Sequence, residues 1–339
     1  MHDVLVVGAG PAGLAVALGA ARAGLDVAVC ERRAGPLDKA CGEGLMPGAV
    51  RALAALGVDP PGQPIRGIAY RRADLVARAA FSSGPGRGVR RTELASALRA
   101  AVDKAGVPVL EHRVSQIRQH HDHVRADELR ARYLVGADGL HSRVRQAAGV
   151  PVKPASGHRW GQRRHYAMAP DSEFVEVHWA AGAEAYVTPV GPAEVGVAVL
   201  SSARGSFEEQ LRAFPTLAGK LASVATLSEV RGAGPLRQRV GGRAAGRILL
   251  VGDAAGYIDA LTGEGIAVSL AAAAELVDCL AADRPDRYPR AWARVSRRSR
   301  LITSGLLWAR GKPPLARVVV PLAVRCPGLF RVAVDQLAG

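Results

Sequence analysis

The feature that most constrains how this chain folds is a pair of glycine motifs about 240 residues apart. Residues 4–13 read VLVVGAGPAG, a short apolar run that ends in G-x-G-x-x-G. Residues 247–256 read RILLVGDAAG, a second apolar run that ends in Gly-Asp followed by a small-residue turn. A strand that passes through G-x-G-x-x-G into a helix is the arrangement that holds the pyrophosphate of a dinucleotide. We therefore predict that one dinucleotide is held by two distant parts of the chain.

Each glycine of the first motif has a separate geometric task. We expect Gly8 to make the tight turn, Gly10 to let the backbone approach the pyrophosphate, and Gly13 to allow close packing of helix on strand. Pro11 and Ala12 begin the Ala-rich helix that follows. The N-terminus of such a helix carries a partial positive charge that favours phosphate, so all five residues are predicted cofactor contacts.

An acidic residue completes this βαβ opening. The second predicted strand, residues 26–30, ends at Glu31, about 20 residues after the glycines. An acidic residue at this place accepts hydrogen bonds from a ribose diol, and we assign that role to Glu31 with Arg32 beside it. Together with the distant Gly-Asp motif, this arrangement indicates FAD rather than an incidental glycine-rich corner.

Composition favours a globular protein with a small-molecule partner. The chain has 339 residues, of which 49% are apolar, so it is long enough for two cores or one large discontinuous domain. The net charge is +15, but the arginines are scattered and aromatic residues make up only 4%. Nucleic-acid binding would need a basic stripe with interleaved aromatic residues, so we expect no nucleic-acid partner. A weak attraction to anionic substrates or membrane surfaces is compatible with the charge.

Cysteine and histidine spacing predicts no metal site. The four cysteines form no C-x-x-C pair. The run His120-His121-Asp122-His123 lies at a predicted hairpin tip, where histidines are usually solvated. The chain shows neither a basic leader with a cleavage site nor an uncharged apolar run of about 18 residues, and we expect a reducing, cytoplasmic setting.

The pattern changes after residue 150, where residues 158–201 become rich in β-forming residues with a period of two. Within this region Val175, Val177 and Trp179 share one face, which predicts a sheet with an apolar face suited to covering a ligand. The predicted division is a discontinuous FAD-binding domain of residues 1–70, 90–152 and 240–300, a substrate-binding sheet of residues 71–89 and 153–239, and a C-terminal helical tail of residues 301–339.

These motifs resemble those of the flavin-dependent hydroxylases related to para-hydroxybenzoate hydroxylase and, more closely, those of the geranylgeranyl reductase branch of that superfamily. The resemblance covers about the first 280 residues. It rests further on residues 41–47 (CGEGLMP), 137–145 (ADGLHSRVR), 186–197 (YVTPVGPAEVGV) and 251–266 (VGDAAGYIDALTGEGI). It implies an α/β fold: a Rossmann-like, GR2-type FAD-binding domain with an inserted antiparallel β-sheet substrate domain and a helical C-terminal tail.

The resemblance assigns the second glycine motif to the flavin side of the cofactor. It implies that Gly252 and Asp253 bind the ribityl chain, with the carboxylate accepting from a hydroxyl. It implies that Gly263, Gly265 and Ile266 form a helix start whose backbone N–H groups face the N1 and O2 edge of the flavin. A helix N-terminus there would stabilise the negative charge of a reduced flavin without any side chain.

The remaining predicted cofactor contacts have alternative interpretations. The resemblance places Arg91 near the FAD phosphates or ribityl chain, although an exposed charge before a helix is the alternative. Asp138 matches the family's Asp-Gly motif, and ordinary turn chemistry is the alternative. Cys41 and Gly42 lie in the segment expected at the flavin edge. Cys41 is a candidate proton donor or gate, or else a small residue in a tight loop; Glu43 is a candidate general acid, or a loop carboxylate paired with an arginine.

Four residues of the predicted sheet domain are candidates for the substrate pocket. They are Trp160, His178, Tyr186 and Thr188. For Trp160 and Tyr186 a place in the core is an equal alternative.

Three functions follow from the resemblance, from two enzyme classes and one binding class. The first is a monooxygenase that hydroxylates an aromatic, quinone or polyketide-type molecule through a flavin C4a-hydroperoxide. The second is a reductase of carbon–carbon double bonds on an isoprenoid substrate, like geranylgeranyl reductase, and the third is a non-enzymatic prenyl-binding protein. The compact chain favours the first by analogy, while the residues at 41–43 and 262–265 favour the second. No second dinucleotide motif is present, so NADH or NADPH is expected only as a transient electron donor.

The basic C-terminal tail is a candidate for peripheral membrane contact, because it mixes cations with apolar residues as an interfacial helix does. The cations are Arg310, Lys312, Arg317, Arg325 and Arg331. A helix packed on the FAD-binding domain is the alternative, and the sequence does not predict the oligomeric state.

Overall fold

The computed structural model describes residues 1–154 and 157–339, and a mainly parallel sheet, with antiparallel pairs at β19–β20 and β9–β10–β11, forms one half of the molecule. Its central strands run in the order β19-β20-β11-β1-β2-β8, with β10 and β9 added beside β11. β1 pairs in parallel with both β2 and β11, and residues 4–6 and 27–30 are buried on both faces, as expected for a covered parallel sheet. The strands are β1 (His2–Val7), β2 (Val27–Glu31), β8 (Val109–Glu111), β9 (Ile117–Gln119), β10 (Val124–Ala126), β11 (Leu129–Gly136), β19 (Ala244–Ala245) and β20 (Ile248–Leu250).

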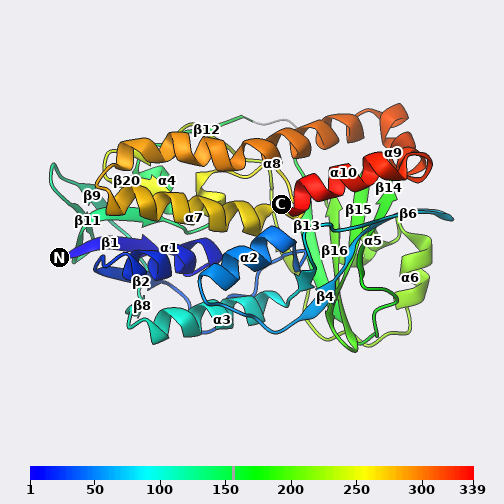
Figure 1. Ribbon diagram of the computed structural model, residues 1–339, viewed down its shortest axis with the longest axis horizontal. Coiled ribbons are helices and arrows are strands. Elements are labelled where there is room, and N and C mark those ends of the chain that lie inside the picture. The colour runs from blue at the N-terminus through cyan, green and yellow to red at the C-terminus, as the bar shows by residue number, and fades with distance from the viewer. Residues whose placement is uncertain (155–156) are drawn as a thin grey trace.

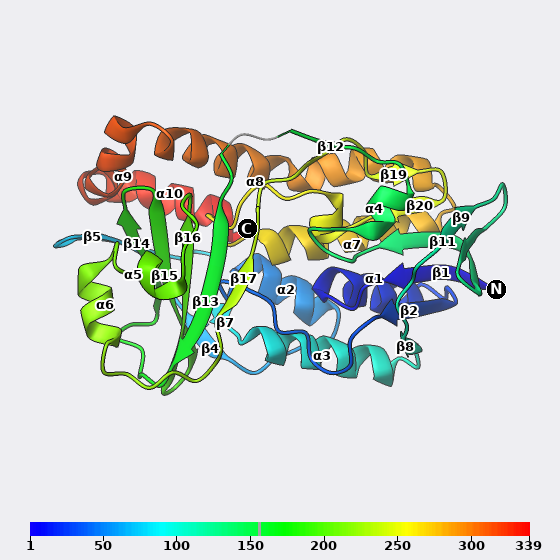
Figure 2. The same cartoon turned by 180° about the vertical axis from the view of Figure 1, so that it is seen from behind.

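Helices cover this sheet and extend toward the second half. α1 packs against α3 and α7, and α7 packs against α8. The helices and helical turns of this half are α1 (Pro11–Arg22), α2 (Pro47–Ala55), α3 (Arg91–Lys104), α4 (Arg143–Ala147), η1 (Gly252–Ala255), α7 (Gly265–Ala281), η2 (Pro285–Arg287) and α8 (Tyr288–Arg310). In Figures 1 and 2 α8 runs along the molecule from this sheet to the second one.

A seven-stranded sheet forms the other half, in the order β17-β13-β16-β15-β14-β5-β6. It is mixed rather than wholly antiparallel, because β14 pairs in parallel with β5. β5 starts at Gly67, so the sheet takes residues 67–70 that the sequence placed with the FAD-binding domain. The strands are β5 (Gly67–Arg72), β6 (Leu75–Ala80), β13 (Trp160–Tyr166), β14 (Phe174–Ala180), β15 (Ala183–Gly191), β16 (Glu194–Ser201) and β17 (Arg231–Ala233).

The two faces of this sheet have different coverings. One face packs on α5 (Phe207–Leu211) and α6 (Pro215–Leu221). The other face, which carries Val175 and Val177, lies toward the parallel-sheet half and the C-terminal helices. Short strand pairs connect the halves: β3 (Gly44–Leu45), β4 (Gln63–Ile65) and β7 (Gly86–Gly88) form one sheet, and β12 (Val152–Lys153) pairs with β18 (Arg239–Val240).

The C-terminal region is helical, as the sequence predicted. α9 (Pro313–Arg325) and α10 (Pro327–Ala338) follow α8, and a proline begins each of them. Both pack on β6, and α10 returns the C-terminus to the middle of the molecule, where Figure 1 marks it. Among the described residues, no helix has both the length and the apolar character needed to cross a bilayer.

Candidate functional site

The loop between β1 and α1 forms a cradle whose glycines have distinct surroundings. Gly8 has φ +108°, and a Cβ there would lie 2.5 Å from the carbonyl oxygen of Ala137. A Cβ on Gly13 would lie 1.9 Å from the carbonyl oxygen of Gly8. A Cβ on Gly10 would meet no atom within 4 Å, and Gly10 lines the cavity between the two halves. Packing therefore requires glycine at 8 and 13, whereas Gly10 leaves backbone open to a ligand.

Glu31, at the end of β2, is held at one side of this cradle. Its carboxylate accepts the backbone N–H of Ala9 at 3.0 Å and that of Arg33 at 3.2 Å. Each oxygen therefore has one fixed donor and retains a lone pair for a ribose hydroxyl. The neighbouring Arg32 side chain is exposed.

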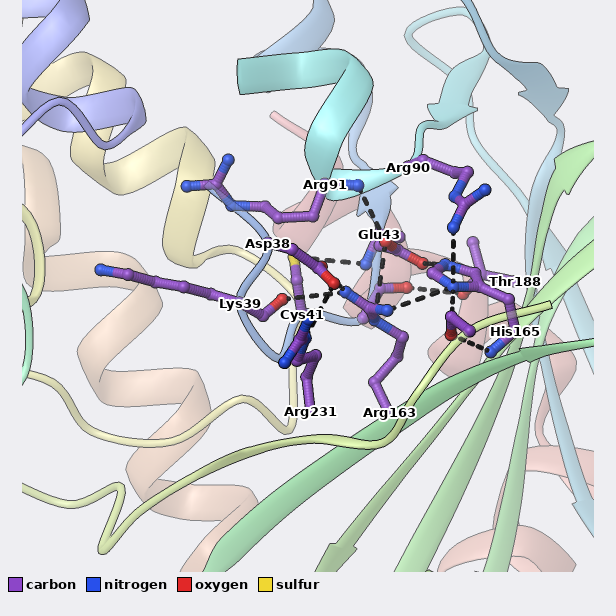
Figure 3. Close-up of polar contacts among 12 residues, drawn as sticks. Asp38, Lys39, Cys41, Glu43, Arg90, Arg91, Arg163, His165, Thr188 and Arg231 are labelled. Atoms are coloured by element: carbon purple, nitrogen blue, oxygen red, sulfur yellow. Dashed lines mark hydrogen bonds and ion pairs between the residues drawn. The ribbon is translucent and has the colours of Figure 1, made fainter. Parts of the chain in front are cut away.

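Two cations and a carboxylate face each other beyond the cradle. Asp253 is accessible from the cavity, yet burial by the surrounding protein raises the pKa of its carboxyl, opposed by the charges of Lys39 and Arg91. Figure 3 shows the Lys39 and Arg91 side chains extending in the same direction, away from Glu43. Burial lowers the pKa of both cations, and Nη1 of Arg91 is buried without a hydrogen-bond partner. An orphaned guanidinium donor beside an ammonium group fits the diphosphate of FAD.

The segment after β2 brings a second carboxylate, Glu43, under the opposite wall of the cavity. Glu43 has φ +61°, an uncommon conformation for a residue with a side chain. Its carboxylate is almost fully buried and accepts the backbone N–H of Arg91 at 2.8 Å. It lies 2.7 Å from Nε2 of His165 and 3.7 Å from Nε of Arg163, both on β13 (Figure 3). The strained loop is thus fixed by side chains from the seven-stranded sheet.

The neighbours of His165 determine which ring nitrogen carries the proton. Nη1 of Arg163 lies 3.1 Å from Nδ1 of His165, and Nη2 of Arg90 lies 3.4 Å from the same nitrogen. A guanidinium only donates hydrogen bonds, so Nδ1 accepts and the ring proton is assigned to Nε2. His165 therefore donates to Glu43.

Two further contacts hold the loop between the halves. Asp38 is ion-paired with Arg163 and, at 3.0 Å, with Arg231. Burial alone would raise the pKa of the Asp38 carboxyl, but hydrogen bonds from Arg231 and Arg163 outweigh it and lower the pKa. On the other side of the loop, the Thr188 hydroxyl donates to the carbonyl oxygen of Gly42 at 2.7 Å. We call Asp38, Glu43, Arg163, His165 and Arg231 the Glu43 cluster.

Cys41 lies between the cations of the cradle and the Glu43 cluster. Its thiol lines the cavity, and the backbone N–H of Glu43 points to its sulfur at 3.4 Å. Burial raises the pKa of the Cys41 thiol, and the negative charge of Glu43 raises it further. The thiol therefore stays protonated at neutral pH, which suits a proton donor better than a nucleophile.

The cavity itself has a volume of about 240 Å³ and is mostly apolar. The hydroxyl of Tyr186 donates to the carbonyl oxygen of Leu261 at 2.9 Å, and burial raises its pKa well above the usual value. A second tyrosine of the sheet, Tyr70 on β5, also lines this wall, and burial raises the pKa of its hydroxyl too. The apolar lining comes from Ile65, Ile68, Tyr70, Phe81, Val175, Val177, Ala198, Leu200, Leu236, Leu261 and Leu337.

The structure brings most of the predicted site residues to this one cavity. Those that line it are Gly10, Pro11, Ala12, Cys41, Gly42, Glu43, Arg91, Tyr186, Gly252, Asp253, Gly263, Gly265 and Ile266. Gly8, Gly13 and Glu31 support the cradle behind them, and Thr188 holds the loop rather than facing the cavity. Asp138 accepts the backbone N–H groups of Arg143 and Val144, and its other oxygen is buried without a partner.

Two residues expected in the substrate pocket lie elsewhere. His178 is out of phase with Val177 on β14, so it faces the opposite side of the sheet, 3.4 Å from Glu176. Trp160 is likewise out of phase with Gly161 on β13 and stacks under Arg204, with 4.9 Å from the guanidinium carbon to the ring centroid. Successive side chains of a strand point to opposite faces, so a shift of one position removes each from the cavity.

The sequence interpretation missed Lys39 and the cluster residues of β13. A signal was present in Gln162-Arg163-Arg164-His165, four polar residues inside a strand, where buried charge implies a buried partner. Among the residues that the structure describes, no group of His, Cys, Asp or Glu is arranged to hold a metal ion.

Comparisons with known proteins agree with this geometry. A family model described as FAD binding domain matches residues 1–285. Menaquinone reductase of Mycobacterium tuberculosis is 30% identical, with 99% of this chain and 90% of that protein covered. Digeranylgeranylglycerophospholipid reductase 2 of Methanopyrus kandleri is 32% identical, with 79% of this chain and 74% of that protein covered.

A solved flavoprotein/dehydrogenase from Cytophaga hutchinsonii has the same fold. Its TM-score is 0.83 at 19% identity, with 99% of this chain and 92% of that chain covered. The likeness confirms the predicted fold class, an α/β FAD-binding domain with an added sheet and a helical C-terminal region.

Proposed function

Because this chain belongs to the FAD binding domain family, we propose that it is an FAD-dependent reductase that saturates a carbon–carbon double bond in the isoprenoid chain of a quinone. The family model covers most of the chain, and the two curated relatives described above are reductases. The protein is therefore an FAD-dependent oxidoreductase. The reaction and the substrate are our proposal.

The observation that carries the proposal is an apolar cavity with a protonated thiol beside the cofactor cradle. The thiol belongs to Cys41, and the wall opposite it includes Val175, Val177 and Leu200. An isoprenoid chain offers almost only apolar surface, and burying it supplies about 25 cal/mol per Å². Such a cavity binds a prenyl chain by hydrophobic burial and keeps water from the reacting carbons.

Saturation of a double bond adds one hydride and one proton. This chain has residues to bind the cofactor that supplies the hydride and a residue to supply the proton. Lys39, Arg91 and the Gly10 backbone would hold the diphosphate of FAD, and Asp253 its ribityl chain. When bound, FAD supplies the hydride, and a reduced nicotinamide is the donor that we expect to restore it. We assign the proton to the Cys41 thiol, which gives it to the second carbon and regains one from water.

The monooxygenase that the sequence placed first becomes the second candidate. Oxygen chemistry on a flavin also needs a dry cavity, so the apolar lining is compatible with it. The names of the relatives favour reduction. A non-enzymatic prenyl-binding protein is a poorer explanation, because the cradle keeps its glycines, Glu31 and Asp253.

The test is product analysis with menaquinone carrying an unsaturated side chain. We expect the FAD-loaded, chemically reduced protein to yield, without oxygen, a product heavier by two hydrogens. In D2O both added hydrogens should be deuterium, because the thiol hydrogen and the N5 hydrogen of a reduced flavin both exchange with solvent. A product heavier by one oxygen, formed only in air, would support the monooxygenase instead.

A variant of Cys41 tests the proposed proton donor. The Cys41→Ala variant should still bind FAD, and its FAD should still be reduced by the nicotinamide. Turnover should fall about a hundredfold, which is a usual size for general-acid catalysis. Cys279→Ala, at a buried cysteine of α7 that does not line the cavity, is the matched control and should turn over normally. Equal rates for the two variants would remove Cys41 from the mechanism.

A further inference from the structure

The exposed large apolar side chains of the described residues concentrate on the last three helices. Only four lie elsewhere in the described chain, and one of those, Leu75, is on β6 against which α9 and α10 pack. The exposed apolar residues of these helices are Leu301, Trp308, Val318, Leu322, Val324, Leu329 and Val332. In Figure 1 α9 lies at the end of the molecule opposite the N-terminus.

Both α9 and α10 have an apolar face on each side. On α9 Val320 and Ala323 are buried, while Val318 and Leu322 point outward. On α10 Phe330, Val334 and Leu337 are buried, while Leu329 and Val332 are more than half exposed. The inner faces satisfy the packing of the helices, so the outer apolar residues are not needed to hold them in place.

Unpaired cations lie among these outer apolar residues. From residue 288 to the C-terminus the chain has ten basic residues and a single acidic one, Asp335. The carboxylate of Asp335 accepts a hydrogen bond from the backbone N–H of Ser82 at 2.8 Å. Arg317, Arg325 and Arg331 are exposed, and none has a carboxylate partner among the described residues.

We propose that this tail surface, formed by Val318, Leu322, Val324, Leu329 and Val332 with Arg317, Arg325 and Arg331, docks on a bilayer of anionic phospholipids. The apolar side chains enter the interface, and the arginines contact the phosphate groups of the lipids. Two copies of the same surface would bring like charges together, so self-association on this face is opposed by charge.

The opposite face of the same helices contacts the apolar cavity. Leu337 lines the cavity, and Phe330 contacts Tyr70, another lining residue, with 4.7 Å between ring centroids. One layer of helix therefore separates the tail surface from the cavity. Docking there would bring the cavity next to the phase in which a prenyl lipid is dissolved. The docking itself does not depend on the proposed reaction, because binding is measured without turnover.

Vesicle flotation with the full chain is the test. We expect the protein to float with phosphatidylglycerol vesicles at low salt and not with phosphatidylcholine vesicles. Reversing three charges near an anionic surface removes three attractive contacts, so Arg317→Glu/Arg325→Glu/Arg331→Glu should weaken binding at least about a hundredfold. Leu322→Ser/Leu329→Ser should weaken the part of binding that survives high salt.

The control places the same charge change at the opposite end of the molecule. Arg113→Glu/Arg118→Glu/Arg130→Glu alters three exposed arginines beside the hairpins of β9, β10 and β11. It should bind vesicles like the parent. Equal loss in both triple variants would show general attraction of a basic protein and overturn the proposal, as would equal binding to phosphatidylcholine or no binding by the parent. A dimer in light scattering that only the Leu322/Leu329 variant dissolves would identify a second copy as the occupant.

Discussion

Two buried carboxylates flank the cavity, and their surroundings differ in one respect. Glu43 is 3% exposed and Glu264, which precedes α7, is 8% exposed. Glu43 is met by the N–H of Arg91, the ring of His165 and the guanidinium of Arg163. One oxygen of Glu264 has no hydrogen-bond partner, and burial raises the pKa of its carboxyl to about 7.

The comparison shows that burial alone does not decide what a carboxylate does to stability. Partners from several elements compensate the charge of a buried carboxylate, whereas a carboxylate with too few donors is driven toward its neutral form. The groups around Glu43 come from strands distant in sequence, whereas Glu264 lies at the end of a single turn. Charge compensation therefore stabilises the loop of Cys41, whereas the uncompensated carboxylate in the turn before α7 lowers stability.

The largest effect is expected from removing the paired carboxylate. Glu43→Ala leaves the buried Arg163 and His165 without their acceptor, and should lower the free energy of unfolding by about 3 kcal/mol in urea denaturation at pH 7. Alanine keeps the same strain at φ +61°, so the difference reports the carboxylate. A change below about 1 kcal/mol would mean that Asp38 alone compensates Arg163.

The opposite sign is expected at Glu264. Its folded-state pKa is raised, so the folded protein holds the proton longer than the unfolded chain, and stability falls as pH rises from 4.5 through about 7. Glu264→Gln removes this loss and should raise the free energy of unfolding by about 2–3 kcal/mol at pH 8 but by little at pH 5. Thermal unfolding at the two pH values measures it, and an equal gain at both would contradict a titration effect.

Charge at Glu43 also acts on the thiol, which gives a smaller, kinetic prediction. Glu43→Gln keeps the shape of the side chain but removes the negative charge that raises the pKa of Cys41. At neutral pH the thiol stays protonated in both proteins, so turnover there should change by less than about threefold, with FAD content unchanged. The loss of activity at high pH, where the thiol ionises, should begin at lower pH than in the parent.

The same substitution on the other face of the sheet provides the control. Glu176 is also buried and is paired with Arg71 at 2.7 Å, but it does not line the cavity. Glu176→Gln should leave turnover and its pH profile unchanged. A pH profile of Glu43→Gln that matches the parent would reduce Glu43 to a purely structural role.

The contrast between local and distant contacts also explains how far the sequence could be read. The motifs at Gly8 and Gly252 predicted the cradle and the fold, because their geometry depends on residues close in sequence or on the backbone. The Glu43 cluster joins residues more than 120 positions apart, and no short pattern predicts that His165 contacts Glu43. The prediction that His178 lies in the substrate pocket was wrong for a different reason. The alternation of apolar and polar residues shows that a strand has two faces, but not which face lies against the cavity.

The smallest effect, on the affinity for FAD, is expected at Gly10, where an added Cβ would meet no protein atom within 4 Å. Gly10 has φ −74°, which any residue adopts, and open space where a Cβ would stand. If that space belongs to FAD, Gly10→Ala should weaken FAD binding about fivefold while the apoprotein unfolds within about 0.5 kcal/mol of the parent. Gly219→Ala on α6, also without a neighbour within 4 Å but far from the cavity, should leave FAD affinity unchanged. Titration of both apoproteins with FAD, followed by flavin fluorescence, separates the two sites. Unchanged affinity in Gly10→Ala would mean that the cofactor does not approach the backbone there, because a methyl group in that space has nothing else to displace.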